Sequence, residues 1–375
     1  MPLYMTHGNT GALLNFGSDG MPTQNGTFEY SAAMIVPESA QAPGQAAPLV
    51  EFGHGLLGAK ESVLGFQEIA AQLNLATFAL DFKGFSSDDQ VTILSALSGG
   101  DWSDFRAIPE RTHQGFLNFL MAMRTLSREA GGGPDTELNK ALASDCGGAM
   151  IDGEKRYYFG GSQGGIFGAC LMALTTDIER GVIAVPGQSY NLLLNRSVDV
   201  DFFAPFMYGP YDWNGLDLQM NLALIQGLWD GAEPTGYSKY IRNDRFPDTP
   251  AHDVLIQVSK SDHQVTNLGA HIMARAIGGV VNLAADDDVA NIIRPVWDID
   301  VVSGTHTGSG MIEVDFGNPD APIGNYPPWD DTMQDPHGRA TELTALGPVI
   351  STFYETGDVE NPCKGPCDAD DLQPQ

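Results

Sequence analysis

One serine stands in a sequence context that suits nucleophilic catalysis. Residues 157–165 read YYFGGSQGG, an apolar run that ends in two glycines, then the serine and two further glycines. Residues 160–164 fit the motif G-x-S-x-G, in which a sharp turn between a strand and a helix exposes a serine hydroxyl. The start of that helix directs free N–H groups, that of Gln163 among them, at whatever bonds to the Ser162 oxygen. A plain glycine-rich turn is the alternative, but the apolar strand before it and the small-residue helix after it favour a catalytic Ser162.

The segments around this turn predict a parallel sheet. Residues 49–53 read as a short buried strand, residues 62–73 carry apolar side chains at helical spacing, and residues 75–82 read as a second strand. A strand, a helix and a strand in this order form a unit whose two strands are parallel. Further strands are expected over residues 181–185, 254–258 and 295–302, and helices over about residues 110–130 and 265–276. The fold class is therefore α/β, with a mostly parallel central sheet flanked by helices.

Two regions depart from this alternation of strands and helices. Residues 27–36 alternate apolar and polar side chains as a half-buried strand does, and with residues 13–16 they predict an antiparallel hairpin at a sheet edge. Residues 187–250 are too long and too apolar for a loop. They predict either an extra helical layer with its own small core or a cap over the active site. We expect the cap, with Phe206 and Trp213 lining an apolar substrate pocket.

The chain is expected to divide into a core, a cap segment and a tail. Residues 1–186 and 251–357 would form the core, residues 187–250 the cap segment, and residues 358–375 the tail. The tail contains Cys363 and Cys367. Zinc would need two more ligands nearby, and the tail supplies none, so a local disulfide is the preferred interpretation.

No metal or organic cofactor is expected from the sequence. It contains no H-E-x-x-H motif, no phosphate-binding G-x-x-x-x-G-K motif, and no dinucleotide fingerprint in the right context. The acidic run at residues 286–288 reads as a solvated turn rather than a calcium site.

The charge of the chain limits its partners. Its 19 Lys and Arg residues against 48 Asp and Glu residues give a formal net charge of −29. Such a surface repels nucleic acid and anionic membranes, so neither is an expected partner. No apolar run approaches the ~18 residues of a membrane-spanning helix, so no membrane span is expected.

The expected location is secreted or periplasmic. A disulfide in the tail requires an oxidising compartment. The chain opens with Met1-Pro2-Leu3-Tyr4, without the basic and then apolar pattern of a signal peptide. A secreted protein would have lost its signal peptide, and a cytoplasmic protein is the alternative.

A parallel sheet with a nucleophile turn after a central strand and an aromatic insertion later resembles the α/β-hydrolase superfamily, over about residues 45–357. Residues 54–58, HGLLG, are also similar to the H-G-L-x-G bend of many bacterial lipases and esterases. The resemblance implies that the backbone N–H of Leu56 is a second oxyanion donor beside that of Gln163. Two such fixed donors would stabilise negative charge that develops on a carbonyl oxygen. His54 itself is expected to be structural.

The resemblance also implies an acid and a base, in the chain order Ser, acid, His. Asp262 lies in residues 259–265, SKSDHQV, between a strand and a helix, where the superfamily places its acid. A helix N-cap is the alternative role for this aspartate. His337 precedes the final helix, where the superfamily places its base, and His306 is the alternative. Residues 308–336 between the two histidines are expected to be an insertion that contains a strand-like run, residues 311–316.

These residues together predict two-step acyl transfer without a cofactor. His337 would accept the proton of Ser162 as the serine attacks an ester carbonyl, and water would later free the acid. The expected function is serine-dependent hydrolysis of carboxylic esters, lipase- or esterase-like, on small apolar or polymeric substrates. A serine peptidase or amidase on the same fold is the first alternative. A non-catalytic binding protein is the second, and the intact Ser, Asp and His set argues against it.

A peptidase that selects free amino termini would need carboxylates near its substrate pocket. Asp199 and Asp201 in the cap segment are the only residues that hint at this.

Overall fold

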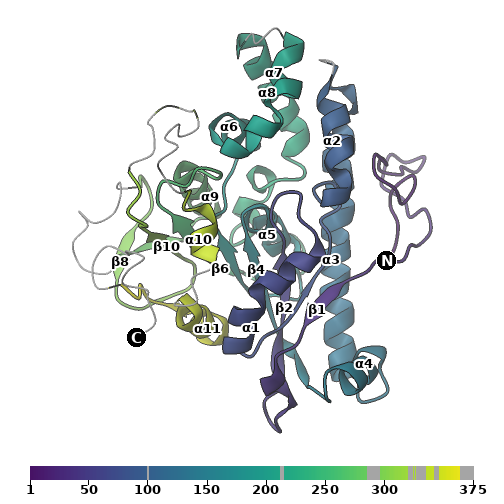
Figure 1. Ribbon diagram of the computed structural model, residues 1–375, viewed down its shortest axis with the longest axis vertical. Coiled ribbons are helices and arrows are strands. Elements are labelled where there is room, and N and C mark those ends of the chain that lie inside the picture. The colour runs from purple at the N-terminus through teal and green to yellow at the C-terminus, as the bar shows by residue number, and fades with distance from the viewer. Residues whose placement is uncertain are drawn as a thin grey trace.

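The computed structural model describes residues 1–98, 101–211, 215–284, 296–319, 324, 326, 335–341 and 346–363. Its central strands are β1 (Ala33–Ile35), β2 (Ala47–Gly53), β3 (Ala76–Ala79), β4 (Ile151–Gly161), β5 (Arg180–Ala184), β6 (Asp253–Ser259), β7 (Val281–Ala284), β8 (Val301–Ser303) and β10 (Gly310–Val314). They form one sheet in the order β1-β3-β2-β4-β5-β6-β10-β7-β8 (Figure 1). β1 runs antiparallel to β3, and the other pairings described in this sheet are parallel. The predicted fold class, a mostly parallel α/β sheet, is confirmed.

Helices cover both faces of the sheet because its strands are apolar on both sides. Successive side chains of a strand point to opposite faces. Tyr158 of β4 accordingly packs in the cluster that contains residues of α3 (Ala107–Gly131), α5 (Gln163–Leu174) and α9 (Asn267–Ile277). Its neighbours Tyr157 and Phe159 pack in a second cluster, with residues of α1 (Gln67–Gln72) and α11 (Gly347–Thr356). This arrangement, a mostly parallel sheet with helices on both faces, is the one that the sequence led us to expect.

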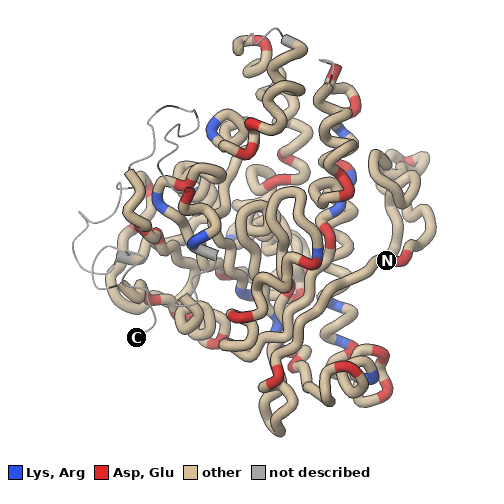
Figure 2. The backbone as a smooth tube through the Cα atoms, in the orientation of Figure 1, with Lys and Arg blue, Asp and Glu red and all other residues tan. Residues whose placement is uncertain are grey.

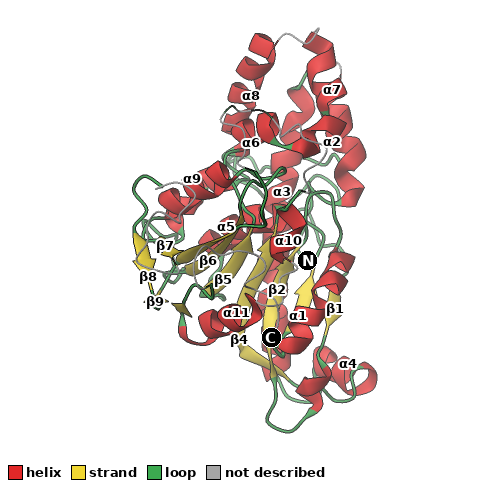
Figure 3. Cartoon of the chain, turned by 60° about the vertical axis from the view of Figure 1, so that its left-hand side comes forward, coloured by secondary structure: helices red, strands yellow, loops and turns green. Residues whose placement is uncertain are grey.

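The cap segment stands beyond one end of the sheet. It contains α6 (Tyr190–Arg196), α7 (Ala204–Tyr208) and α8 (Gly215–Trp229), which pack against one another. Figures 1 and 3 show these helices projecting together at the top of the molecule, with α2 (Gln90–Leu97) beside them. α2 precedes the cap segment by almost a hundred residues, so part of this layer comes from a stretch to which the sequence assigned no structure.

The N-terminal region differs from the predicted hairpin. β1 occupies the sheet edge, but its partner is β3, with Met34 opposite Phe78. Leu14 and Phe16 instead form isolated bridges with Met5 and Pro22. The alternation of residues 27–36 indicated a half-buried strand, but alternation identifies faces and does not identify partners.

The strand expected within residues 308–336 is present, but it belongs to the central sheet and not to an insertion. Gly310–Val314 forms β10, which lies between β6 and β7 and is parallel to both. β8, which covers the end of the strand expected over residues 295–302, is an edge strand instead of the last central one. A short apolar run predicts a strand but does not predict its rank in the sheet, and this explains the error.

Two small features complete the core. β9 (His306–Thr307) and β11 (Asp358–Val359) form a separate antiparallel pair. α4 (Glu137–Asp145) follows α3 and is capped by Thr136, whose hydroxyl accepts a hydrogen bond from the backbone N–H of Asn139. Among the described helices, none is both long and apolar enough to cross a membrane.

The cysteines differ in their bonding. Cys363 is disulfide-bonded, whereas Cys146 and Cys170 are free thiols. Cys367, the predicted partner of Cys363, lies outside the described residues.

Figure 2 shows acidic residues on the core and on the cap segment alike, and the net charge of −29 is therefore spread over the molecule.

Candidate active site

Ser162 occupies a strained turn between β4 and α5. Its φ and ψ angles are 58° and −123°, a conformation that a residue with a side chain rarely adopts. A Cβ atom at Gly160 would overlap the backbone of Gly164, and a Cβ at Gly164 would overlap the carbonyl oxygen of Gly53. The hydroxyl of Tyr158 donates a hydrogen bond of 2.5 Å to the Gly164 carbonyl. The glycines of the motif therefore let strand and helix approach, as the sequence predicted.

Asp262 and His337 form a buried pair although they are 75 residues apart. Nδ1 of His337 lies 2.7 Å from Oδ2 of Asp262, and their side chains are 7% and 1% exposed. Because a carboxylate only accepts hydrogen bonds, Nδ1 carries the proton of a neutral ring and Nε2 carries a lone pair. Nε2 is buried and has no hydrogen-bond partner among the described residues. The imidazole is thus oriented to accept a proton at Nε2.

The loop after β6 holds Asp262 in place through Oδ1, the carboxylate oxygen that does not bind His337. Oδ1 accepts hydrogen bonds of 2.8 Å from the backbone N–H groups of Gln264 and Val265. The N-cap of α9 is Thr266. The alternative reading of Asp262 as the cap of this helix is therefore wrong.

Carboxylates surround His337 and set its pKa. Burial by itself lowers the pKa of His337, but the charge and hydrogen bond of Asp262 outweigh it. Asp335 and Asp199 add further negative charge, so the pKa of His337 lies above its ordinary value.

Asp335 joins the two loops that carry Asp262 and His337, a role that sequence reasoning missed. Its Oδ1 accepts a hydrogen bond of 3.0 Å from the backbone N–H of His337 and one of 3.3 Å from that of His263. Its Oδ2 accepts Nε2 of Gln264 at 2.7 Å. The sequence feature that could have identified Asp335 is its position two residues before His337, where a carboxylate can accept a hydrogen bond from a backbone N–H at the start of a helix.

His306 lies at the other end of the sheet. It belongs to β9, and a Cβ at the nearby Gly308 would contact both His306 and Asp253. Asp253 is the first residue of β6, whereas Asp262 follows the last residue of that strand. The structure therefore brings His337 to Asp262 and places His306 away from it.

The bend after β2 faces the serine turn. Leu56 and Gln163 line the same cavity as Ser162, and within the described part of the chain neither backbone N–H has a hydrogen-bond acceptor. His54 is fully buried beneath the bend. Its Nε2 accepts the backbone N–H of Phe82 at 2.8 Å, and its Nδ1 donates to the Gly55 carbonyl at 2.8 Å. His54 thus has the structural role that was expected.

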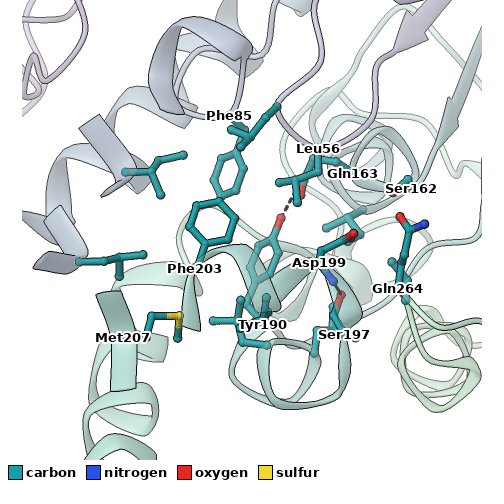
Figure 4. A pocket seen from close by; sticks show the side chains of 18 of the residues that line it. Leu56, Phe85, Ser162, Gln163, Tyr190, Ser197, Asp199, Phe203, Met207 and Gln264 are labelled. Carbon is teal, nitrogen blue, oxygen red and sulfur yellow. Dashed lines mark hydrogen bonds between the residues drawn. The ribbon is translucent and has the colours of Figure 1, made fainter. Parts of the chain in front are cut away.

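A narrow, mainly apolar cavity of about 100 Å³ opens beside Ser162 (Figure 4). Its walls come from the core and from the cap segment and include Phe85, Phe105, Tyr190, Phe203, Met207, Leu222 and Ile225. Among the described residues that line it, Asp199 is the one with a charged side chain. Side chains of this kind suit an apolar substrate group with few polar contacts.

The two aromatic residues expected in this pocket are not among its described lining. Phe206 of α7 is 36% exposed, while Met207 of the same helix and Phe203, the N-cap residue before it, line the cavity. Phe203 and Met207 are four residues apart and both turn toward the cavity, whereas the side chain of Phe206 is turned toward solvent. Trp213 lies outside the described residues. The sequence predicted an aromatic cap but did not determine which face of the helix turns inward.

Among the described residues, no group of three or more His, Cys, Asp or Glu side chains gathers in a way that could hold a metal ion.

No protein-family model matches the sequence, and no curated protein matches it either. Solved structures with a similar fold include an acylaminoacyl peptidase in complex with Z-Gly-Gly-Phe-chloromethyl ketone, at 12% identity and a TM-score of 0.43 over 88% of this chain and 39% of that one. A puromycin-hydrolyzing peptidase from Mycobacterium tuberculosis is similar at 13% identity and a TM-score of 0.46, over 91% of this chain and 39% of that one. An acetyl xylan esterase from Paenibacillus sp. R4 is similar at 14% identity and a TM-score of 0.40, over 72% and 73% of the two chains. Values this low leave the activity to be argued from the site itself.

Proposed function

We propose that this protein is a serine hydrolase that cleaves carboxylic esters through an acyl-enzyme intermediate. The observation that carries the proposal is the buried pair of Asp262 and His337, with Nδ1 held at 2.7 Å and Nε2 left without a partner. A neutral imidazole held in this way is a general base. Ser162 is the proposed nucleophile, because it lies in a strained turn and lines the cavity together with Leu56 and Gln163.

The proposed reaction has two steps. Nε2 of His337 accepts the proton of the Ser162 hydroxyl while the serine oxygen bonds to the ester carbonyl carbon. The N–H groups of Leu56 and Gln163 donate to the oxyanion, and Asp262 stabilises the imidazolium. His337 then protonates the leaving alcohol as the ester C–O bond breaks. Water, activated by the same imidazole, attacks the acyl-enzyme and releases the acid and Ser162.

The apolar cavity supports an ester with an apolar acyl group, small or polymeric. The cap segment, residues 187–250, is proposed to set the length of the group that fits. A serine peptidase or amidase is the second candidate, and Asp199 favours it because a carboxylate in this pocket suits a substrate with a free amine. The paired Asp262 and His337 argue against a non-catalytic binding protein.

We further propose a secreted or periplasmic location. The disulfide at Cys363 supports an oxidising compartment. The acidic surface supports neutral or cationic small-molecule substrates over nucleic acid.

A fluorophosphonate probe followed by peptide mass spectrometry tests the nucleophile. Label on Ser162, absent in Ser162→Ala, is expected. Ser197 also lines the cavity, so label there would contradict the proposal. Turnover of 4-nitrophenyl esters of two to twelve carbons should be lost in Ser162→Ala with little change in the thermal midpoint. Faster turnover of peptide anilides than of matched esters would favour the peptidase.

A further inference from the structure

We propose that Asp199 selects substrates that carry an ammonium group a few bonds from the scissile carbonyl. The proposal rests on the serine-hydrolase function above and names the substrate class for the same pocket. Asp199 lies in the single 3-10 turn Val198–Phe202 that follows α6. Figure 4 shows it in the pocket wall, with Ser197 and Gln264 nearby.

The carboxylate of Asp199 has no cationic partner in the described part of the chain. No Lys or Arg there forms an ion pair with it, and its backbone N–H donates to the hydroxyl of Ser197 at 3.1 Å. Burial raises the pKa of Asp199, which means that the ionised form has lost hydration. A substrate ammonium group would restore the lost interaction, because a half-buried charge gains from a partner of opposite sign.

Asp199 also lies close to the reacting atoms. Its charge acts on His337, together with the charges of Asp335 and Asp262. The rest of the lining is apolar or neutral, so an ammonium group that enters the pocket meets one carboxylate on its walls. A metal ion is a poorer fit for Asp199, since no cluster of ligands surrounds it among the described residues.

The net negative charge of the whole chain also favours cationic substrates. A net charge of −29 raises the local concentration of cations and repels anions. Long-range attraction would thus bring ammonium-bearing substrates to the molecule, and Asp199 would orient them beside Ser162.

Two matched substrate pairs test the proposal and locate the cation. Alanine 4-nitrophenyl ester and 4-nitrophenyl propionate differ by an ammonium group on the acyl side. Choline butyrate and 3,3-dimethylbutyl butyrate differ by a cationic centre on the alcohol side. Each pair is measured with the wild type, Asp199→Asn and Asp199→Glu. Asp201→Asn is the control, since Asp201 is exposed and outside the described lining.

The readout is the ratio of kcat/KM for the cationic over the neutral substrate, because an intrinsic difference in reactivity cancels between variants. In at least one pair, Asp199→Asn should lower this ratio by about tenfold or more, as expected for a lost hydrogen bond to a charged group. Asp199→Glu should retain part of the ratio, and Asp201→Asn should leave it unchanged.

Two outcomes would overturn the proposal and remain distinct from each other. Equal losses on both members of each pair would mean that Asp199 acts through His337 and not on the substrate. Unchanged kcat/KM for both members of each pair in Asp199→Asn would remove Asp199 from substrate selection, while turnover of the neutral esters at Ser162 would leave the serine-hydrolase function intact. No turnover of any of the four esters by the wild type would instead contradict the proposed function itself.

Discussion

The imidazole of His337 is held at one nitrogen and left without a partner at the other. His337→Ala should therefore lower ester turnover about as severely as Ser162→Ala does, because members of a catalytic unit do not contribute additively. His306→Ala should retain most of the activity, since His306 lies at the opposite end of β6. Steady-state kcat/KM for 4-nitrophenyl butyrate is the measurement. An inactive His306→Ala with an active His337→Ala would mean that the base is misassigned.

At the scale of elements, the carboxylate of Asp335 links the loop after β6 to the start of α10 (His337–Thr341). Asp335→Ala should lower kcat by about tenfold to a hundredfold with little change in KM, since small displacements of a catalytic group have effects of this size. The acid limb of the kcat/KM profile should also move to lower pH, because Asp335 helps to raise the pKa of His337 and catalysis needs the neutral ring.

Asp315→Asn is the matched control for this change. Asp315 forms an ion pair of 2.8 Å with Lys260, two residues before Asp262, and within the described part of the chain it has no hydrogen bond or ion pair with His337. A profile that stays in place in Asp335→Asn and Asp335→Ala would show that Asp335 does not act on His337.

The helix α7 should govern acyl-chain preference through one face only. Phe203→Ala should shift relative kcat/KM toward longer acyl chains, because one methylene in an apolar pocket is worth about 1–3 kcal/mol. Phe206→Ala, three residues further on in α7 and outside the described lining, should leave the preference unchanged. A series of 4-nitrophenyl esters from two to twelve carbons measures this. The same shift in both variants would mean that the helix packs less tightly as a whole and does not read chain length through Phe203.

For the whole molecule, a buried glutamate makes stability depend on pH. Glu51 of β2 is 1% exposed, its carboxyl oxygens have no hydrogen-bond partner among the described residues, and burial raises its pKa to about 8. The folded state therefore holds a proton that the unfolded chain releases near its ordinary pKa of 4.5. The associated stability is fully present below that pKa and is lost as the pH rises through about 8.

Glu51→Gln should remove this dependence. Its free energy of unfolding should exceed that of the wild type by about 3 kcal/mol at pH 7, and the difference should shrink toward pH 4. Thermal or urea unfolding across this pH range measures the effect, with the exposed Glu154 of β4 changed to Gln as a control. A constant difference at every pH would place the effect in packing and not in the proton.

Local sequence accounts for the serine turn, the HGLLG bend, the parallel strands and the order of Ser162, Asp262 and His337 along the chain. These features depend on sterics and periodicity within a few residues, such as the need for glycine where a Cβ would overlap a neighbouring backbone. The position of β10 between β6 and β7, the pairing of β1 with β3, the inward face of α7 and the tie made by Asp335 were decided by the tertiary structure. Each depends on contacts between segments tens to hundreds of residues apart, and no pattern within one segment encodes which distant partner it will meet.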